Sequence, residues 1–313
     1  MAQFQILVSD GLDDEGLALL RQGGEVRFKP QISAEDLQVE IGDCDALVVR
    51  SRTRVTRAVI QAGKQLKVIG RAGVGVDNID LSAAAGAGII VVNSPTAATR
   101  AVAEMALAFM LALARQLPAQ DASMKMGKWE KSAYLGSELN GKTLGIVGLG
   151  RIGSQLALYA RAIGMHVLAY HPDQSEAEVA RLGAQITGFD ELLAGSDYLS
   201  IHTPLNGETR NLLGRAEFAR MKPGVRLINT ARGGIVDEVA LCEALDSGHV
   251  AGAALDVFAS EPVVPGSIAS HPRVIATPHI AAQTEEAQAR AGVAIAEEVL
   301  AALQGQPLRW RVA

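Results

Sequence analysis

An arginine, a glutamate and a histidine in the second half of the chain are of the types needed to move a proton beside a carboxylate. Arg232 lies between Asn229 and Gly234, Glu261 follows it by 29 residues, and His279 follows Glu261 by 18 residues. A guanidinium binds a carboxylate through charge-assisted hydrogen bonds, and an imidazole exchanges a proton with a hydroxyl or carbonyl oxygen. A glutamate beside the imidazole tunes that exchange. We therefore expect these three residues to act together on a small acid.

A glycine-rich turn precedes this group in the sequence. The apolar run Thr143–Val147 leads into Gly148, Gly150 and Gly153, and a helical pattern begins at Ser154. The first glycine permits a tight turn, the second lets the backbone approach a pyrophosphate, and the third lets the helix pack closely on the strand. The helix N-terminus offers N–H groups and the positive end of its dipole to the phosphates. The turn predicts a nicotinamide dinucleotide, and with it hydride transfer to or from a 2-hydroxy acid.

The residue at the end of the following strand decides between two forms of this cofactor. An acidic residue there binds the ribose hydroxyls of NAD, yet Tyr170 is followed by His171, Pro172 and Asp173. Either His171 or Asp173 contacts the ribose, or the missing carboxylate at position 171 admits the extra phosphate of NADP. No arginine stands beside His171 to bind that phosphate. We expect NAD, with NADP as the alternative.

Composition and charge argue against several classes of protein. The chain has 313 residues, 49% of them hydrophobic, which predicts two domains with separate cores. A net charge of -5 with dispersed Lys and Arg predicts neither a nucleic-acid partner nor an anionic membrane surface. Cys44 and Cys242 form no CxxC pair, and the N-terminus lacks the layout of a signal peptide. The most apolar stretch, 101–114, contains Glu104 and is shorter than the roughly 20 residues of a membrane span. We expect a cytoplasmic protein without a metal.

Short apolar runs alternate with helical patterns along the chain, which is typical of parallel sheets wrapped by helices. One series lies within residues 4–92 and a second within 143–276. Helices expected near Thr99–Leu113 and at Glu285–Leu303 would carry the chain from one series to the other and back. We predict an α/β protein with two Rossmann-like or flavodoxin-like parallel-sheet domains and a cleft between them. The predicted substrate-binding domain comprises 1–98 plus 286–313, and the predicted NAD-binding Rossmann domain comprises 99–285.

Several passages together resemble the D-isomer-specific 2-hydroxyacid dehydrogenases over nearly the whole chain. They are Gly70–Asn78, Trp129 with Gly136–Gly145, Gly148–Gly153, Asn229–Gly234, Leu255–Phe258, and Thr277–His279 with Thr284–Gln288. Within that family the resemblance is greatest to the D-3-phosphoglycerate dehydrogenases. It implies NAD-dependent oxidation of D-3-phosphoglycerate to 3-phosphohydroxypyruvate and the reverse reduction, the first step of serine biosynthesis.

The resemblance also implies roles for single residues. Arg232 would bind the substrate carboxylate, His279 would be the acid/base, and Glu261 would accept a hydrogen bond from it. The predicted cofactor contacts are Val74, Gly148, Gly150, Arg151, Ile152, Gly153, His171, Thr203, Pro204, Thr230, Ala231, Arg232, Asp256, His279 and Ala281.

A phosphate on the substrate would need cations, and two turns at strand ends of the first domain carry them. Similar arginine-bearing turns receive the phosphate in 3-phosphoglycerate dehydrogenases. The alternative is that these arginines are surface or ion-pair residues. The predicted substrate contacts are Arg50, Ser51, Arg52, Arg71, Ala72, Gly73, Arg232 and His279.

Two other functions stay open. A glyoxylate or hydroxypyruvate reductase would share the catalytic residues and need no phosphate cluster. A nicotinamide-sensing scaffold, as in corepressors that resemble this family, would need no turnover, and the complete catalytic set argues against it. The chain stops at Ala313, so we expect no appended regulatory domain, and the resemblance implies a homodimer through the cofactor domain. The segment Lys125–Gly136, with Trp129 and Tyr134, is either an arm that packs on a second subunit or a surface loop.

Overall fold

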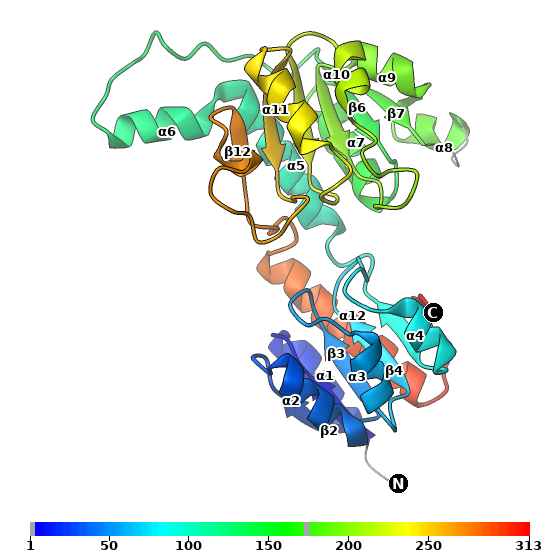
Figure 1. The fold of residues 1–313 in the computed structure, drawn as a ribbon. Helices are drawn as coiled ribbons and strands as arrows, with labels where there is room; N and C mark the ends of the chain where they lie inside the picture. Colours follow the sequence, from blue (N-terminus) through cyan, green and yellow to red (C-terminus); the bar gives the residue numbers. More distant parts are fainter. Residues whose placement is uncertain (1–3, 172–175) are drawn as a thin grey trace. The chain divides into compact units, whose positions relative to one another are not determined.

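The computed structural model describes residues 4–171 and 176–313 and divides the chain into two compact units. The first unit contains Met1–Thr99 and Ala282–Ala313, and the second contains Arg100–Ala281. Figure 1 shows the first unit in blue and cyan with an orange-red last helix, and the second unit in green to orange. The chain therefore leaves the first unit once and returns to complete it.

The first unit is a five-stranded parallel sheet in the order β2-β1-β3-β4-β5. Its strands are β1 (Phe4–Val8), β2 (Gly24–Phe28), β3 (Ala46–Val49), β4 (Val68–Arg71) and β5 (Ile90–Asn93). Its helices are α1 (Asp14–Gly23), α2 (Ala34–Glu40), the 3-10 turn η1 (Ile41–Asp43), α3 (Arg57–Ala62), α4 (Leu81–Gly86) and α12 (Glu285–Leu303).

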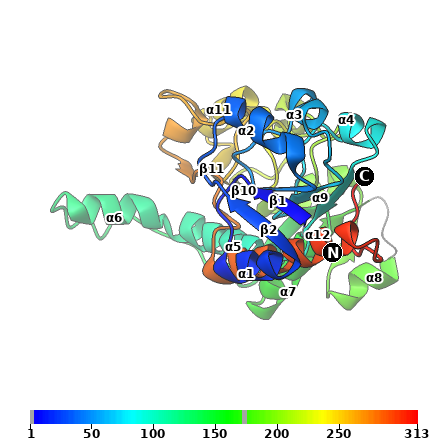
Figure 2. The same cartoon turned by 90° about the horizontal axis from the view of Figure 1, so that it is seen from below.

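Helices cover both faces of this sheet, so its strands are apolar on both sides. Leu7 of β1 packs with residues of α2, α3 and α4, whereas its neighbours Ile6 and Val8 pack with α1 and α12. The helices α1 and α12 lie side by side (Figure 2), and glycines meet where they touch. A Cβ atom on Gly16 would lie 2.6 Å from the carbonyl carbon of Gly292. The close approach of α12 thus depends on a residue without a side chain in α1.

The second unit is a seven-stranded parallel sheet in the order β12-β11-β10-β9-β6-β7-β8. Its strands are β6 (Thr143–Val147), β7 (His166–Tyr170), β8 (Gln185–Ile186), β9 (Tyr198–Ile201), β10 (Val225–Asn229), β11 (Val250–Leu255) and β12 (Val274–Ala276). Its helices are α5 (Thr99–Arg115), α6 (Leu117–Lys125), α7 (Arg151–Ala162), α8 (Glu176–Arg181), α9 (Phe189–Gly195), α10 (Arg215–Arg220), α11 (Glu238–Asp246) and the 3-10 turn η2 (Ile268–Ser270).

Residues of α5 and α7 pack on one face of this sheet and residues of α9, α10 and α11 on the other. The order of the strands reverses between β6 and β9, and ligands of doubly wound sheets bind outside the carboxyl ends of the strands at such a point. In the first unit the corresponding point lies between β1 and β3. The predicted α/β class with two parallel-sheet domains is confirmed.

The chain between the two series of strands forms an extension of the second unit. The helix α5 ends at Arg115, Gln116 has a left-handed φ of 53°, and α6 begins at Leu117. In Figure 1, α6 and the loop after it project from the sheet; we call residues 117–136 the arm. Large apolar side chains are exposed along it: Leu117, Met124, Met126, Trp129 and Leu135. Within the described part of the chain no single helix is long and apolar enough to span a membrane, although the bent pair α5 and α6 passes on length and composition.

Candidate active site

The glycine-rich turn joins β6 to α7 at the point where the strand order reverses. Gly148 has a φ of 92°, which side-chain-bearing residues rarely adopt, and a Cβ there would lie 2.8 Å from the carbonyl oxygen of His202. A Cβ on Gly153 would lie 2.2 Å from the carbonyl oxygen of Gly148. Gly150 is the N-cap residue of α7, and no side chain there bonds to the first N–H groups of the helix. A Cβ atom on Gly150 would meet no other atom within 4 Å. Helix N–H groups beside an open glycine suit a phosphate.

We predict that alanine has different effects at two of these glycines. Gly153→Ala places a methyl group against a backbone carbonyl oxygen, so the free energy of unfolding falls by about 2 kcal/mol. Gly150→Ala meets no atom within 4 Å, so stability is retained. Its methyl group occupies the space a pyrophosphate would approach, and the NADH affinity falls about tenfold or more. Thermal unfolding and NADH fluorescence titration measure both effects, and wild-type NADH affinity in Gly150→Ala would contradict this placement.

Two buried polar atoms at the ends of β9 and β10 have no hydrogen-bond partner among the described residues. They are Nδ1 of His202 and Oγ1 of Thr230. Burial lowers the pKa of His202 to about 4, so its ring is neutral, and its Nε2 lies 2.8 Å from Oγ of Ser200. Buried polar atoms nearly always have a partner, so these two fit a polar ligand at this edge of the sheet. Thr230 was predicted from the sequence as a cofactor contact, whereas His202 was not, although His202 directly follows a buried strand.

The other predicted cofactor contacts of the second unit also lie near the carboxyl ends of its strands. Arg151 and Ile152 open α7, His171 follows β7, and Thr203 and Pro204 follow β9. Ala231 follows β10, and Asp256 directly follows β11. Ala281 is the last residue of the second unit, whereas Val74 belongs to the first unit and follows β4. Asp173, the alternative ribose contact, lies outside the described residues.

Glu261 and His279 are in direct contact. Nδ1 of His279 lies 2.9 Å from Oε2 of Glu261, and the two side chains are 47% and 38% exposed. The other carboxylate oxygen of Glu261 accepts the N–H of Phe258 at 3.0 Å, which holds the carboxylate in place. Because Glu261 occupies Nδ1, the Nε2 atom is the nitrogen left for a reacting group. The pair is therefore arranged to hold an imidazole in one orientation and to move a proton at Nε2.

Arg232 lies in the turn that follows β10. Its side chain donates to the carbonyl oxygen of Ala231 at 2.6 Å, and Asn229 donates to the carbonyl oxygen of Arg232 at 3.0 Å. Arg232, Glu261 and His279 follow β10, β11 and β12, which are neighbours in the sheet. The carboxyl ends of parallel neighbours share one edge, so the structure brings the three predicted catalytic residues to the same edge.

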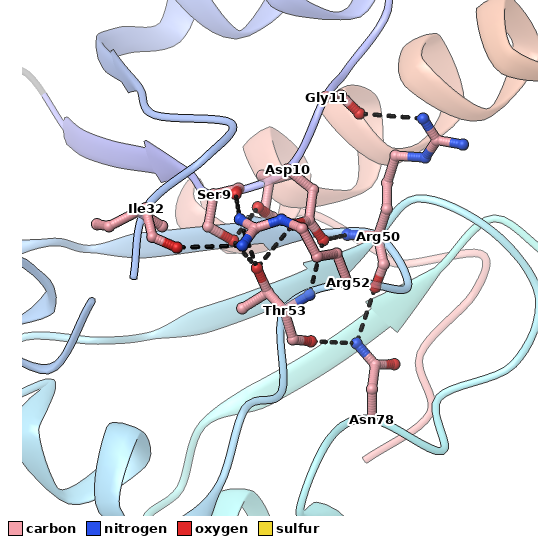
Figure 3. Close-up of polar contacts among 9 residues, drawn as sticks. Ser9, Asp10, Gly11, Ile32, Arg50, Arg52, Thr53 and Asn78 are labelled. Carbon is pink, nitrogen blue, oxygen red and sulfur yellow. Dashed lines mark hydrogen bonds and ion pairs between the residues drawn. The ribbon is translucent and has the colours of Figure 1, made fainter. Parts of the chain in front are cut away.

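In the first unit a buried carboxylate organises the turn after β3 (Figure 3). Asp10 is 3% exposed, and its oxygens accept the N–H of Arg50 at 2.6 Å, the N–H of Thr53 at 3.2 Å and Oγ1 of Thr53 at 2.7 Å. Asn78 donates to the carbonyl oxygens of Arg50 and Thr53. Sequence reasoning missed Asp10 and Asn78. The signal for Asp10 was a carboxylate two residues beyond the strand that ends at Val8.

The guanidinium of Arg52 is turned toward this network (Figure 3). Its Nε lies 3.1 Å from Oδ1 of Asp10, and its terminal nitrogens donate to the carbonyl oxygens of Ile32, at 3.1 Å, and of Ser9. A guanidinium has five N–H donors, so these bonds use most of them. Arg52 therefore has the contacts of a residue that shapes the turn.

Arg50 and Arg71 are engaged differently. The terminal nitrogens of Arg50 donate to Oε1 of Gln283 at 3.0 Å and, over 3.4 Å, to the carbonyl oxygen of Gly11, and burial lowers the pKa of this guanidinium. Arg71 makes a 3.3 Å contact with the carbonyl oxygen of Ala72. The partners of Arg50 are an amide oxygen and a carbonyl oxygen, whereas Arg52 pairs with the carboxylate of Asp10. The remaining predicted substrate contacts are Ser51, which is exposed, Ala72, which is buried, and Gly73, whose N–H donates to Oγ of Ser94.

One group of side chains in the described part of the chain has the composition of a metal site. Ligand atoms of Cys242, Asp246 and His271 lie within 4.8 Å of one another. However, Nδ1 of His271 accepts the N–H of Arg273 at 3.1 Å, so the neutral ring carries its proton on Nε2, 3.2 Å from Oδ1 of Asp246. A metal-bound histidine instead donates from the nitrogen opposite the metal. The contacts are those of a hydrogen-bonded pair, and we assign no metal to this group.

The fold and the glycine turn define a dinucleotide-binding α/β protein with an imidazole–carboxylate pair at the strand ends. A model of the "D-isomer specific 2-hydroxyacid dehydrogenase, NAD binding domain" matches residues 107–281. The chain belongs to the D-isomer specific 2-hydroxyacid dehydrogenase family, as its motifs predicted.

Relatives and solved structures resemble the chain over nearly its whole length. It is 48% identical over 307 residues to a D-3-phosphoglycerate dehydrogenase of Archaeoglobus fulgidus and 47% identical over 305 residues to one of Bacillus subtilis. Each match covers 97% of this chain but 58% of the relative, so the chain spans little more than half their length. The crystal structure of the TT0316 protein from Thermus thermophilus is 36% identical, with a TM-score of 0.91 and 99% and 100% of the two chains covered. A glyoxylate reductase from Paecilomyes thermophila is 33% identical, with a TM-score of 0.91 and 100% and 99% covered.

Proposed function

We propose that the protein oxidises D-3-phosphoglycerate to 3-phosphohydroxypyruvate with NAD and catalyses the reverse reduction, the first step of serine biosynthesis. The contact that carries this proposal is the 2.9 Å pair of His279 and Glu261, on the strand edge that also holds Arg232. The relatives named D-3-phosphoglycerate dehydrogenase supply the choice of substrate. Their greater length leaves the activity of this chain to be measured.

The residues divide the chemistry between them. Arg232 binds the substrate carboxylate and so orients the carbon that bears the hydroxyl group. His279 takes the hydroxyl proton at Nε2 during oxidation and returns it to the carbonyl oxygen during reduction. Glu261 holds the imidazole through Nδ1 and balances the charge that His279 gains. NAD, when bound along the glycine turn and the ends of β9 and β10, supplies the hydride chemistry.

A reductase for glyoxylate or hydroxypyruvate is the second candidate, because the chain is also 33% identical to a solved glyoxylate reductase, a lower identity than the 48% to a D-3-phosphoglycerate dehydrogenase. The test is NADH oxidation by the purified protein with 3-phosphohydroxypyruvate, hydroxypyruvate and glyoxylate under identical conditions. A kcat/KM that is highest for the phosphorylated acid supports the proposal. A preference for the unphosphorylated acids selects the reductase, and no turnover with any of them would favour the scaffold function.

Within this proposal Arg50 and Arg71 bind the substrate phosphate, and Arg52 supports the turn. We predict that Arg50→Gln raises the KM for 3-phosphohydroxypyruvate about tenfold or more, because a charge-assisted bond to the phosphate is lost. The KM for hydroxypyruvate should change little. Arg52→Gln is the control, since its bonds go to Asp10 and to backbone oxygens and its loss should affect both acids alike. Equal effects of Arg50→Gln on the two acids would contradict a phosphate contact.

We propose NAD as the physiological cofactor, with NADP as the alternative that His171 leaves open. The family model describes an NAD binding domain, and no arginine adjoins His171 in the sequence. The ratio of kcat/KM for NADH to that for NADPH decides between them. A ratio below one would reverse the assignment.

We further propose that the protein is a cytoplasmic homodimer that binds neither nucleic acid nor membrane. The arm supports the dimer, because Trp129 is 80% and Leu135 92% exposed on a segment that projects from the sheet. Burying such side chains against a second copy removes apolar surface from water. We predict a mass near twice 32.8 kDa in sedimentation equilibrium, and Trp129→Glu should shift it toward the monomer. A monomer at micromolar concentration would contradict the dimer.

A further inference from the structure

Asp256, at the end of β11, is bonded to the turn that carries His279. Its side chain is fully buried. Oδ1 accepts hydrogen bonds from the Thr277 hydroxyl, at 2.5 Å, and from the N–H of Ile280, at 2.8 Å. Oδ2 accepts a hydrogen bond from the N–H of Ala281 at 2.8 Å. These bonds lie on both sides of His279 along the chain. A single carboxylate therefore fixes the backbone before and after the imidazole.

The turn needs such support because His279 has an unfavourable backbone conformation. Its φ is 55°, in the left-handed region that residues with a side chain rarely adopt. The direction of its ring depends on this φ, and the 2.9 Å contact with Glu261, which lies on another loop, depends on the direction of the ring. A relaxed turn would move Nδ1 away from Glu261 and Nε2 away from the substrate.

We propose that Asp256 is a positioning residue, which holds the left-handed turn so that His279 meets Glu261 and presents Nε2 to the reacting atoms. The catalytic consequence rests on the proposed function, whereas the support of the turn does not. Asp256 was predicted from the family resemblance as a cofactor neighbour. The contacts with residues 277, 280 and 281 give it a second role, and the two roles have different experimental signatures.

Exchanging the carboxylate for an amide of the same size tests the proposal. In Asp256→Asn one carboxylate oxygen becomes an NH₂ group. Because the two oxygens accept different backbone N–H groups, of Ile280 and Ala281, either orientation of the amide sets donor against donor. The buried N–H group left without an acceptor then loosens the turn.

A matched control lies one strand away in the sheet. Asn229, at the end of β10, is 2% exposed and closes the turn of Arg232: its Oδ1 accepts the N–H of Ala231 at 3.0 Å and its Nδ2 donates to the carbonyl oxygen of Arg232 at 3.0 Å. Asn229→Asp sets an oxygen against that carbonyl. It is an equally buried, equal-volume change that acts on the arginine turn instead of the histidine turn.

The experiment compares the full-length wild-type protein with both variants by hydrogen exchange and kinetics. In Asp256→Asn we expect the amides of Ile280 and Ala281 to exchange about tenfold faster or more, kcat to fall about a hundredfold, and the NADH dissociation constant to rise by a much smaller factor than kcat falls. In Asn229→Asp the faster exchange should lie near residues 230–234, and the KM for the acid should rise more than kcat falls. Thr277→Val removes one of the three bonds and should give a smaller loss of kcat; it carries the test if Asp256→Asn does not fold.

Two results would overturn the proposal. One is unchanged exchange at Ile280 and Ala281 in Asp256→Asn. The other is a loss of NADH affinity as large as the loss of kcat, which would mean that Asp256 acts on the cofactor directly. If the wild-type protein turns over none of the acids, the proposed function fails, and the exchange measurement alone decides whether Asp256 holds the turn.

Discussion

Replacing His279 by asparagine should lower kcat about a thousandfold or more and leave NADH binding nearly unchanged. Asparagine has no group that exchanges a proton at neutral pH, so the reacting oxygen loses its acid/base. It is also the side chain that best tolerates the left-handed φ of 55° at this position, so the turn should keep its shape. Steady-state NADH oxidation with 3-phosphohydroxypyruvate and fluorescence titration with NADH measure the two quantities.

Glu261→Gln is the companion variant. Glutamine still accepts from Nδ1 of His279 through its amide oxygen but cannot balance the charge of the protonated ring. We expect kcat to fall by about ten- to a hundredfold, less than for His279→Asn. If His279→Asn retained a tenth of the wild-type kcat, or if Glu261→Gln were the more damaging change, His279 would not be the acid/base.

Replacing Arg232 by lysine should lower kcat/KM for 3-phosphohydroxypyruvate by about a hundred- to a thousandfold. Lysine keeps the positive charge but loses the planar pair of donors that matches a carboxylate. The effect should appear in the KM for each of the three test acids, since all of them carry the carboxylate. Steady-state kinetics with these acids measure it.

Arg220→Lys is the control for this change. Arg220 lies on α10, where it pairs with Asp190 and Glu217 at the surface, and the exchange there should leave all kinetic constants within about twofold. A KM that stays the same in Arg232→Lys would remove the carboxylate contact from the mechanism.

The α/β class was predictable because strands buried on both faces read as apolar runs. The run 143–147 coincides with β6, and the helix expected after the glycine turn is α7, which begins at Arg151 and not at Ser154. The edge strand β2 was missed, since Gly24–Phe28 carries Glu25 and Arg27 and is only partly buried. Strand pairing there is set by the neighbouring β1, which no local pattern reveals.

The candidate site was predictable where a sequence motif determines the local backbone conformation. It was not predictable where the position of a side chain depends on a residue far away in sequence. The glycine turn and the pairing of Glu261 with His279 followed from motifs. The setting of Arg52 did not, because its guanidinium meets Asp10, which is far away in sequence and reaches it through the pairing of β1 with β3. Charge alone made Arg50 and Arg52 look equivalent. The structure distinguishes them, because Arg52 bonds to Asp10 and to backbone oxygens, whereas Arg50 bonds to the side chain of Gln283.

The packing of α12 against α1 affects the order in which the two units can fold during synthesis. During translation the first 99 residues emerge long before α12, whose Ile295, Ala296 and Val299 are fully buried in the core on one face of the five-stranded sheet. Until then only α1 covers that face, and part of its apolar surface is exposed to other chains. The second unit, by contrast, is complete once residue 281 has been added. The second unit can therefore fold completely before the first unit does. A chaperone would matter most while the five-stranded sheet still lacks α12.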